Sequence, residues 1–400
     1  MQPARGAAWC VLLSLIGLSL AGYLTYIHLG LMRGELLGGA ACSAAGSAFN
    51  CHAVASGPWS AVLGIPLALW GVLGYLAAFA LSLWARQPGG DAAHGATLLF
   101  LLAAAFVGID LALFAVMAAV IRVYCLFCLL TYAVNVGLLA LSARSLPFPW
   151  PRALAHAGEA LGRLLPSAQR PGTELFWGMM LVSVLATAAP HLSTTFAARG
   201  SLASQRKQIQ DFIAQQPRVR VETGGDPSDG PAGAPLELVE FSDFFCPSCQ
   251  HASKMNAIVL ATHRRDLRFV FKHYPLDTAC NNKIHRMVHP GACRVAAASE
   301  CAHLQGKFWP FHDVVFAKGH DYNLNQLEGD ARRLGMDPTA FEACMASGQG
   351  MEAVTRDIEE AAKVNVQSTP TYVLNGIVIT GGFTPSVFND FLSVLRERNK

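Results

Sequence analysis

Residues 236–249 read LELVEFSDFFCPSC, an alternating apolar segment that runs directly into two cysteines separated by two residues. The alternation predicts a strand, and Pro247 suits the first turn of a helix that begins after the first of these cysteines. A second strand is expected over residues 267–271, and residues 278–347 have a mostly helical pattern that precedes an Asn-Gly hairpin signal. This order of elements predicts a thioredoxin-like α/β domain with a helical insertion over residues 236–400.

The chain as a whole has the composition of a membrane protein. Of its 400 residues, 52% are hydrophobic and 14% are charged, whereas about 25% are charged in soluble domains. No lysine precedes Lys207 and no stretch concentrates positive charge, which disfavours nucleic-acid binding. The apolar content excludes a disordered chain.

Four segments reach the roughly 20 apolar residues that a helix needs to cross a bilayer, and a fifth is slightly short. The first is longer than the apolar core of a signal peptide and lacks a small-residue cleavage site at the right distance, so we expect a retained helix. The sequence therefore predicts a multi-pass α-helical membrane bundle, a four-helix core plus a fifth helix, followed by the α/β domain. The expected spans are residues 7–31, 62–83, 96–121, 125–143 and 175–191.

These spans divide the chain into four parts. A four-helix membrane domain is expected over residues 1–145, a cytoplasmic loop and fifth helix over 146–192, a stalk and linker over 193–235, and the α/β domain over 236–400. With a cytoplasmic N-terminus, the arginines of the first two parts lie mostly inside, as the positive-inside rule requires. The α/β domain and all paired cysteines then lie on the outer side of the membrane.

Cysteines suggest the chemistry. Cys246 is expected at a helix N-terminus, where the dipole and free N–H groups stabilise a thiolate, so Cys246 would attack and Cys249 would resolve. Thr369 and Pro370 precede the hairpin, where thioredoxin-like folds carry a cis-proline loop beside the cysteines. A structural disulfide is the alternative interpretation of this C-x-x-C pair.

Cys125 and Cys128 lie one helical turn apart at the start of the fourth expected span, within reach of a soluble thiol and of a lipid-dissolved oxidant. Two cysteines packed in an apolar helix are the alternative, but Cys42 and Cys51 fall on the same side of the membrane. The two C-x-x-C pairs are too far apart in sequence for a zinc ribbon, and no metal site is predicted.

Other polar and sulfur-bearing residues have less specific signals. Asp110 lies in mid-span, where a carboxyl is a functional candidate, although a hydrogen bond to a neighbouring helix is the favoured explanation. Pro290 interrupts the four-residue spacing of His285, His289 and Cys293, which disfavours a metal there, and Cys10 is expected to be buried. One or two structural disulfides, with undecided pairing, are expected among Cys280, Cys293, Cys301 and Cys344.

Several of these motifs resemble known families. Cys42, Cys51, LGIPLALWG at 63–71 and CLFCLLTY at 125–132 resemble the vitamin K epoxide reductase family, over about residues 8–143. Residues 236–398 resemble DsbA-like disulfide oxidoreductases. The motifs of that second resemblance are VEFSDFFCP at 239–247, FKHYPL at 271–276 and TPT at 369–371. The whole chain is similar to bacterial fusions of the two families.

The resemblance implies a quinone-dependent thiol-disulfide oxidoreductase that forms protein disulfides. Thiols of secreted or periplasmic proteins would reduce Cys246–Cys249, and the electrons would pass to Cys42–Cys51, then to Cys125–Cys128, then to a membrane quinone (ubiquinone or menaquinone). The resemblance also implies a location in the bacterial inner membrane, with the C-terminal domain in the periplasm.

Individual roles follow from the same resemblance. Cys42 would exchange with the α/β domain, Cys51 would exchange with Cys125, and Cys128 would face the quinone. Tyr132 matches a quinone-site tyrosine, with an interfacial aromatic anchor as the alternative. Glu240 matches a buried acid that relays protons near the cysteines, with a surface glutamate as the alternative.

Two departures from the family patterns change the expectations. The family often has a serine at the position of Gly57, and Ser56 precedes it, so no serine role is assigned. Pro247 and Ser248 stand where strongly oxidising DsbA proteins have Pro-His, which predicts a milder oxidant.

Two other functions are weighed. A transmembrane exporter of reductant to a reductase or isomerase pathway needs cysteines reachable from the cytoplasm. A non-enzymatic membrane-tethered chaperone would have structural cysteines. Thiol alkylation in cells separates them: Cys246 should be mostly oxidised in a disulfide-forming enzyme, mostly reduced in an exporter, and unaffected by quinone depletion in a chaperone.

Overall fold

The computed structural model describes residues 3–32, 35, 37, 49–62, 65–87, 91–164, 176–178, 180–181, 204 and 206–398. The chain divides into two compact units, formed essentially by residues 1–204 and by residues 205–400. Cys42 and most of the fifth expected span lie outside the described residues.

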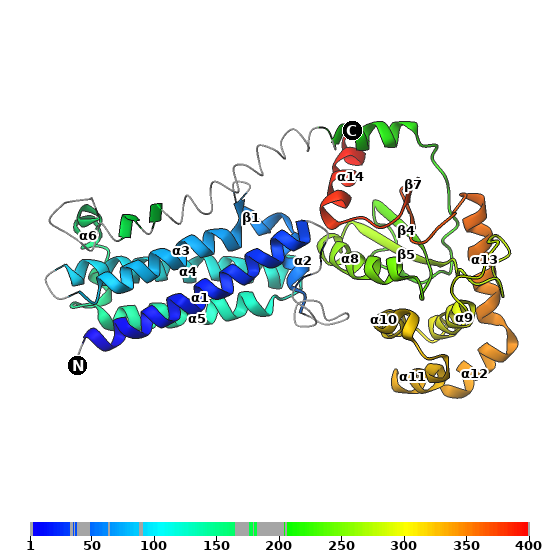
Figure 1. The fold of residues 1–400 in the computed structure, drawn as a ribbon, viewed down its shortest axis with the longest axis horizontal. Helices are drawn as coiled ribbons and strands as arrows, with labels where there is room; N and C mark the ends of the chain where they lie inside the picture. The colour runs from blue at the N-terminus through cyan, green and yellow to red at the C-terminus, as the bar shows by residue number, and fades with distance from the viewer. Residues whose placement is uncertain are drawn as a thin grey trace. The chain divides into compact units, whose positions relative to one another are not determined.

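Four long helices build the first unit (Figure 1). Helix α1 packs against α3 and α5, and α4 packs against the same two helices. All four are long and apolar enough to cross a membrane, which confirms the four-helix core. Their bounds are α1 Pro3–Met32, α3 Leu67–Trp84, α4 Ala92–Val116 and α5 Leu126–Ser145, with a π-helical turn over Met117–Ile121.

The burial of the bundle matches a helical membrane protein. Tyr75, Leu99 and Leu138 are among the buried side chains, whereas Trp9 and Leu111 are more than half exposed. Large apolar side chains that face outward are suited to lipid and would be unfavourable in a soluble bundle.

Short elements at the helix ends change one expected boundary. The second span begins at Leu67 rather than at residue 62, because β1 (Ala61–Val62) and β2 (Ile65–Pro66) pair as an antiparallel hairpin. Pro66 then occupies the N-cap of α3. The remaining short elements are α2 Cys51–Ser56, α6 Ala157–Arg163 and the 3₁₀ turns Pro58–Ser60 and Trp150–Arg152.

The second unit is built on a five-stranded sheet in the order β3-β5-β4-β6-β7. Strand β4 pairs with β5 in parallel and with β6 antiparallel, and the predicted Asn375–Gly376 turn joins β6 to β7. The strands are β3 Ser228–Asp229, β4 Leu236–Ser242, β5 Leu267–His273, β6 Thr371–Leu374 and β7 Ile377–Thr380.

Alternation along β4 assigns the two faces of the sheet. Leu236 and Leu238 pack in one cluster with side chains of α8 (Pro247–His263) and α14 (Pro385–Arg398). Val239 packs on the opposite face in a separate cluster. This thioredoxin-like α/β arrangement confirms the predicted fold class.

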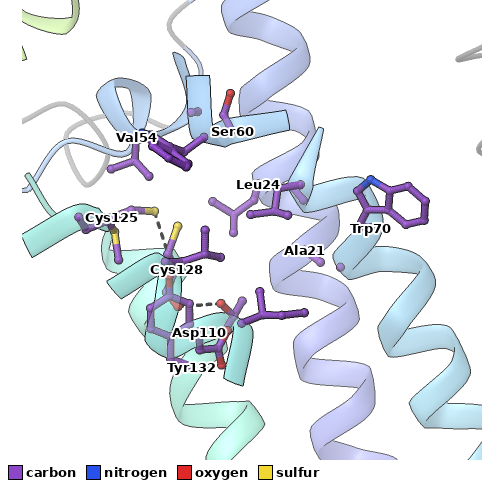
Figure 2. A pocket seen from close by; sticks show the side chains of 18 of the residues that line it. Ala21, Leu24, Val54, Ser60, Trp70, Asp110, Cys125, Cys128 and Tyr132 are labelled. Carbon is purple, nitrogen blue, oxygen red and sulfur yellow. Dashed lines mark hydrogen bonds between the residues drawn. The ribbon is translucent and has the colours of Figure 1, made fainter. Parts of the chain in front are cut away.

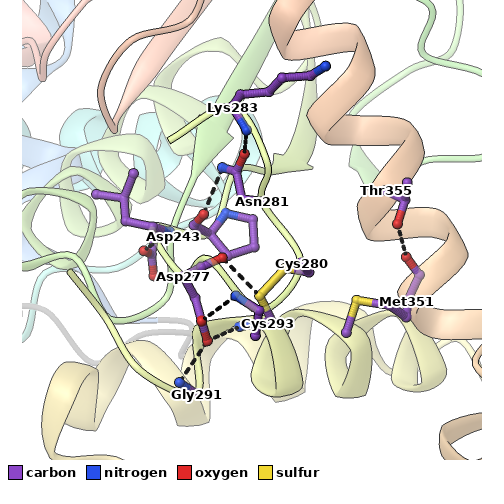
Figure 3. The surroundings of a disulfide bond; sticks show 12 residues. Asp243, Asp277, Cys280, Asn281, Lys283, Gly291, Cys293, Met351 and Thr355 are labelled. Atoms are coloured by element: carbon purple, nitrogen blue, oxygen red, sulfur yellow. Dashed lines mark hydrogen bonds between the residues drawn. A yellow bond between two sulfur atoms is a disulfide. The ribbon is translucent and has the colours of Figure 1, made fainter. Parts of the chain in front are cut away.

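The helical insertion begins later and ends later than residues 278–347. Residues 278–291 are mostly turns, and the helices extend to Lys363. Two disulfides, Cys280–Cys293 and Cys301–Cys344, confirm the expectation of structural pairs. Figure 3 shows Asp277 beside the first of them, where it accepts the Gly291 N–H at 2.8 Å. The helices are α9 Ala292–His303, α10 Phe308–Lys318, α11 Leu327–Arg333, α12 Pro338–Ser347 and α13 Gln349–Lys363.

The segment expected as a stalk and linker contributes to the second unit. Residues 206–215 of the expected stalk are helical. Asp226 forms an ion pair of 2.7 Å with Lys272, a side chain of β5 that is only 3% exposed, and strand β3 pairs with β5. A buried ion pair and strand pairing hold residues 226–229 against the sheet, although the sequence of residues 224–235 predicts a flexible linker.

Candidate active site

The Cys246–Cys249 pair lies where β4 leads into α8. Cys246 occupies the N-cap of α8 and Pro247 its first turn, as predicted. The Cys246 N–H donates to the Asp243 carbonyl at 3.1 Å, and Asp243 Oδ1 accepts the Phe245 N–H at 2.8 Å. These bonds fix the turn that presents Cys246 at the helix N-terminus.

The two sulfurs have opposite electrostatic surroundings. A hydrogen bond from Cys249 lowers the pKa of Cys246 to about 5, and Thr369 and nearby backbone N–H groups act in the same direction against the effect of burial. Burial raises the pKa of Cys249, which is fully buried, well above its ordinary value. Pro370 follows Thr369 through a cis peptide bond, and the Cys246 thiol contacts the Thr369 carbonyl at 3.6 Å. A thiolate beside a protonated thiol is the arrangement that disulfide exchange requires.

The Cys246 thiol is expected to titrate with a midpoint of about pH 5, well below the ordinary value of about 8.5. The thiolate therefore stabilises the reduced fold above the ordinary pKa, and this stability is lost as the pH falls through about 5. Thiolate absorbance of reduced protein, with oxidised protein as the blank, measures the midpoint. Cys249→Ala removes the largest cause and should raise the midpoint, whereas a wild-type midpoint near 8.5 would contradict the assignment.

Glu240 is a buried acid on the α8 face of the sheet, only 1% exposed, so the surface alternative is wrong. Its Oε2 accepts from Asn256 Nδ2 at 2.7 Å, and the Tyr372 hydroxyl donates to Asn256 Oδ1 at 3.1 Å. Burial raises the pKa of Glu240 to about 8, and the charge of Glu240 contributes to the raised pKa of Cys249. These properties fit a group that exchanges a proton with Cys249 near neutral pH.

Asp243 and His289 form a pair that the sequence did not reveal as part of this site. Asp243 Oδ2 accepts from His289 Nδ1 at 2.7 Å. This bond raises the pKa of His289, and the charges of Asp243 and Cys246 raise it further. His289 and Cys293 are two of the three residues whose spacing raised the question of a metal site, the third being His285. In the structure, His289 bonds to Asp243 and Cys293 is in a disulfide.

A backbone contact in the membrane unit brings the second group of cysteines together. Phe49 and Tyr124 form an isolated parallel bridge, and the Asn50 N–H donates to the Tyr124 carbonyl at 2.9 Å. Cys51 at the start of α2 follows Asn50, and Cys125 at the N-cap of α5 follows Tyr124. The side chains of these two cysteines are hydrogen-bonded. The structure thus places together two cysteines that the family resemblance pairs.

Cys128 lies on the first turn of α5, where its N–H donates to Cys125 Sγ at 3.2 Å. Cys51, Cys125 and Cys128 all line one cavity of about 220 Å³, shown in Figure 2. Its wall is mainly apolar and is formed by side chains of α1 to α5 and of the short turns after α2. An apolar cavity with a few polar groups is typical of a site for a small hydrophobic ligand.

The polar groups of this cavity include Tyr132, four residues after Cys128. Asp110 and Asn135 line the same cavity, and Asn135 Nδ2 donates to Asp110 Oδ2 at 2.8 Å. Asp110 on α4 therefore has the hydrogen bond to a neighbouring helix that the sequence favours. A phenol, a carboxyl and an amide could each hydrogen-bond a quinone oxygen, so the lining fits such a ligand.

Sequence reasoning did not identify several cavity residues. Asn135 and Tyr75 are polar side chains inside apolar helices, and nothing in the pattern of one helix shows that they meet. Ser60 lines the cavity, whereas the Ser56 hydroxyl donates to the Ala53 carbonyl of its own helix at 3.2 Å. The serine side chain of the described cavity lining therefore comes from the turn after α2.

The chain matches two family models and several longer proteins. Residues 8–143 match the vitamin K epoxide reductase family, and residues 237–393 match the DSBA-like thioredoxin domain. The Na(+)/H(+) antiporter NhaA of Herminiimonas arsenicoxydans is 36% identical over 168 residues, which are 42% of this chain and 25% of the relative. NhaA 1 of Salinispora arenicola is 34% identical over 158 residues, 40% of this chain and 23% of the relative. The chain thus spans about a quarter of the length of these curated relatives.

Part of this chain is also similar to solved structures. BdbD from Bacillus subtilis has 24% identity, with 46% of this chain and 98% of that chain covered and a TM-score of 0.38. A thioredoxin-like oxidoreductase from Silicibacter pomeroyi has 22% identity, with 44% and 94% covered and a TM-score of 0.38. From the two family matches, the chain joins a vitamin K epoxide reductase family domain to a DSBA-like thioredoxin domain.

Proposed function

We propose that this protein is a membrane thiol-disulfide oxidoreductase that forms disulfides in periplasmic proteins and passes the electrons to a membrane quinone. The observation that carries the proposal is the shared cavity of Cys125 and Cys128 inside a bundle of four apolar helices, with Cys51 hydrogen-bonded to Cys125. A dithiol in such a place can meet a lipid-dissolved oxidant.

The soluble pair begins the relay. A substrate thiolate attacks the Cys246–Cys249 disulfide at Cys246, Cys249 leaves, and the second substrate thiol displaces Cys246 to form the substrate disulfide. Two electrons and two protons have then passed to the cysteine pair. The lowered pKa of Cys246 supports this direction, because stabilising the thiolate favours the reduced pair and makes its disulfide more oxidising.

The membrane cysteines continue the relay. The Cys246 and Cys249 thiols reduce the Cys42–Cys51 disulfide, and Cys51 then attacks Cys125 of the Cys125–Cys128 disulfide. The resulting Cys125–Cys128 dithiol is oxidised again when a quinone takes two electrons and two protons. Tyr132 in the lining supplies a hydroxyl that can orient the quinone.

The location follows from the positive-inside expectation. We propose a cytoplasmic N-terminus and five spans, with the C-terminal unit on the outer, periplasmic side, and the inner membrane that the family resemblance implies. Four described helices support a membrane location, and two disulfides in the second unit suit an oxidising compartment.

Quinone-dependent disulfide formation tests the proposal. Purified full-length protein is mixed with a reduced model protein, and soluble ubiquinone and menaquinone analogues are compared. We expect one quinol for each disulfide formed, and disulfide formation that stops after the enzyme's own oxidised pairs are used when quinone is omitted. Sustained turnover without quinone, or none with either analogue, would overturn the quinone assignment.

A further inference from the structure

Asp110 is the one acidic residue in the described membrane-spanning helices. A carboxyl group in an apolar span is costly and usually serves a function. Asp110 is partly exposed, and the space that it faces is the cavity that also contains Cys128. The hydrogen bond from Asn135 uses one oxygen of the Asp110 carboxyl. This bond does not explain why the carboxyl also lines the cavity.

A chain of hydrogen bonds holds Asp110 in place. The Tyr75 hydroxyl donates to Asn135 Oδ1 at 2.7 Å, and Asn135 Nδ2 donates to Asp110 Oδ2 at 2.8 Å. Tyr75 and Asn135 are 3% and 5% exposed. In this arrangement the amide nitrogen of Asn135 points at Asp110, and the carboxyl accepts on this side. Its second oxygen is available to carry a proton.

Figure 2 shows Asp110 and Tyr132 close together, below Cys128. The Cys128 thiol and the Asp110 carboxyl therefore line different parts of the same cavity. Other titratable groups that line this space are His28 of α1, Cys51 of α2 and Tyr75 of α3, and α5 adds Cys125.

The chemistry of quinone reduction requires two proton deliveries. Oxidation of the Cys125–Cys128 dithiol forms one S–S bond, breaks two S–H bonds and releases two electrons and two protons. The quinone takes both electrons, and each of its two oxygens gains one proton. These oxygens are at opposite ends of the ring, so a thiol next to one of them cannot protonate the other directly.

We propose that Asp110 donates a proton to the quinone oxygen remote from Cys128. This inference rests on the proposed quinone reduction. Asp110 is protonated before the reaction, loses its proton to the remote oxygen and is protonated again from the aqueous phase. The aqueous phase receives the second thiol proton, so the overall reaction still moves two protons from the dithiol to the quinone. Asn135 and Tyr75 are positioning residues for this carboxyl.

The test compares Asp110→Asn with wild type in the full-length protein. Asparagine keeps the size and can still accept from Asn135, but it carries no acidic proton. We expect quinol formation in a single turnover of pre-reduced protein to fall by roughly 10²-fold. Binding of a soluble ubiquinone analogue, followed by quenching of Trp59 and Trp70 in the cavity lining, should change less than about threefold, since general acid catalysis acts on the transition state.

The pH profile is the second measurement. Wild-type single-turnover rates should decrease at high pH as Asp110 loses its proton, and Asp110→Asn should lack this decrease. Asp110→Glu keeps an acid and should retain the decrease, so it also tests the idea if Asp110→Asn does not fold. Thr97→Val is the matched control, because Thr97 is a buried polar residue of the same helix that bonds the Ala93 carbonyl and should leave rate and profile unchanged.

The outcomes separate this inference from the proposed function. A wild-type rate and profile in Asp110→Asn would overturn the role of Asp110 and leave quinone reduction standing. Equal losses of affinity and rate would also overturn it, since they indicate binding rather than proton transfer. If the single-turnover rate of Asp110→Glu did not decrease at high pH, the role of Asp110 would also be overturned. Absence of quinone reduction in the wild type would instead refute the proposed function.

Discussion

Replacing Cys128 with alanine is expected to lower steady-state quinol formation by roughly 10³-fold or more, the size of loss seen when an essential nucleophile is removed. Cys128 lies on the first turn of α5 and lines the cavity, and its N–H contacts the Cys125 sulfur. Without it, Cys125 has no partner on its own helix turn with which to form a disulfide. The membrane unit then cannot pass two electrons to an acceptor.

The same variant should keep the chemistry of the soluble unit. Oxidised Cys128→Ala protein is expected to oxidise a first equivalent of a reduced model protein through Cys246–Cys249 and a second when the Cys42–Cys51 disulfide reoxidises that pair, and then to stop. Stopped-flow measurement of this first equivalent, followed by steady-state quinol formation, separates the two steps. Cys10→Ala is the matched control, because Cys10 is a buried cysteine of α1 and is not among the described lining residues. Wild-type quinol formation by Cys128→Ala would refute the assignment of Cys125–Cys128.

Removing the Cys301–Cys344 disulfide is expected to have the largest effect on stability. The two cysteines are 43 residues apart in sequence and connect α9 with α12. By loop-closure entropy, such a bond stabilises the fold by about 4 kcal/mol, and the Cys280–Cys293 bond, with a separation of 13 residues, by about 3 kcal/mol. The sulfurs of the longer loop are also buried in a hydrophobic cluster with Phe308 and Phe341.

Hydrogen exchange of α9 amides in the full-length protein measures how much each of the two disulfides stabilises the fold. Cys301→Ala/Cys344→Ala should lower the free energy of opening of α9 by about 4 kcal/mol, and Cys280→Ala/Cys293→Ala by about 3 kcal/mol. A loss well under 1 kcal/mol in the first double variant would show that the helical insertion keeps its structure through packing alone.

Much of the fold follows from local patterns in the sequence. The alternation at 236–242, the Asn375–Gly376 turn and the apolar helices are short-range signals, and each of these elements is present. The boundary at Leu67 and the edge strand at Ser228–Asp229 were missed. Both depend on pairing with a second segment, which short-range patterns do not encode.

The residues of the candidate sites also separate into those that local sequence patterns predict and those that depend on distant segments. The helix N-terminus at Cys246 and the cavity position of Tyr132 are consistent with the motifs. The pairing of Asp243 with His289 and of Asp110 with Asn135 joins residues 46 and 25 positions apart. Such contacts are set by tertiary packing, so composition and spacing could not identify them.

The bond from the Asn50 N–H to the Tyr124 carbonyl bears on how readily this protein can vary over evolution. Main-chain groups make the bond, and nearly every amino acid supplies them. Random drift at position 124 should therefore preserve the approach of the two sulfurs that follow. Position 50 is more restricted, because proline lacks the donor hydrogen and the Asn50 side chain caps α2 by accepting the Ala53 N–H.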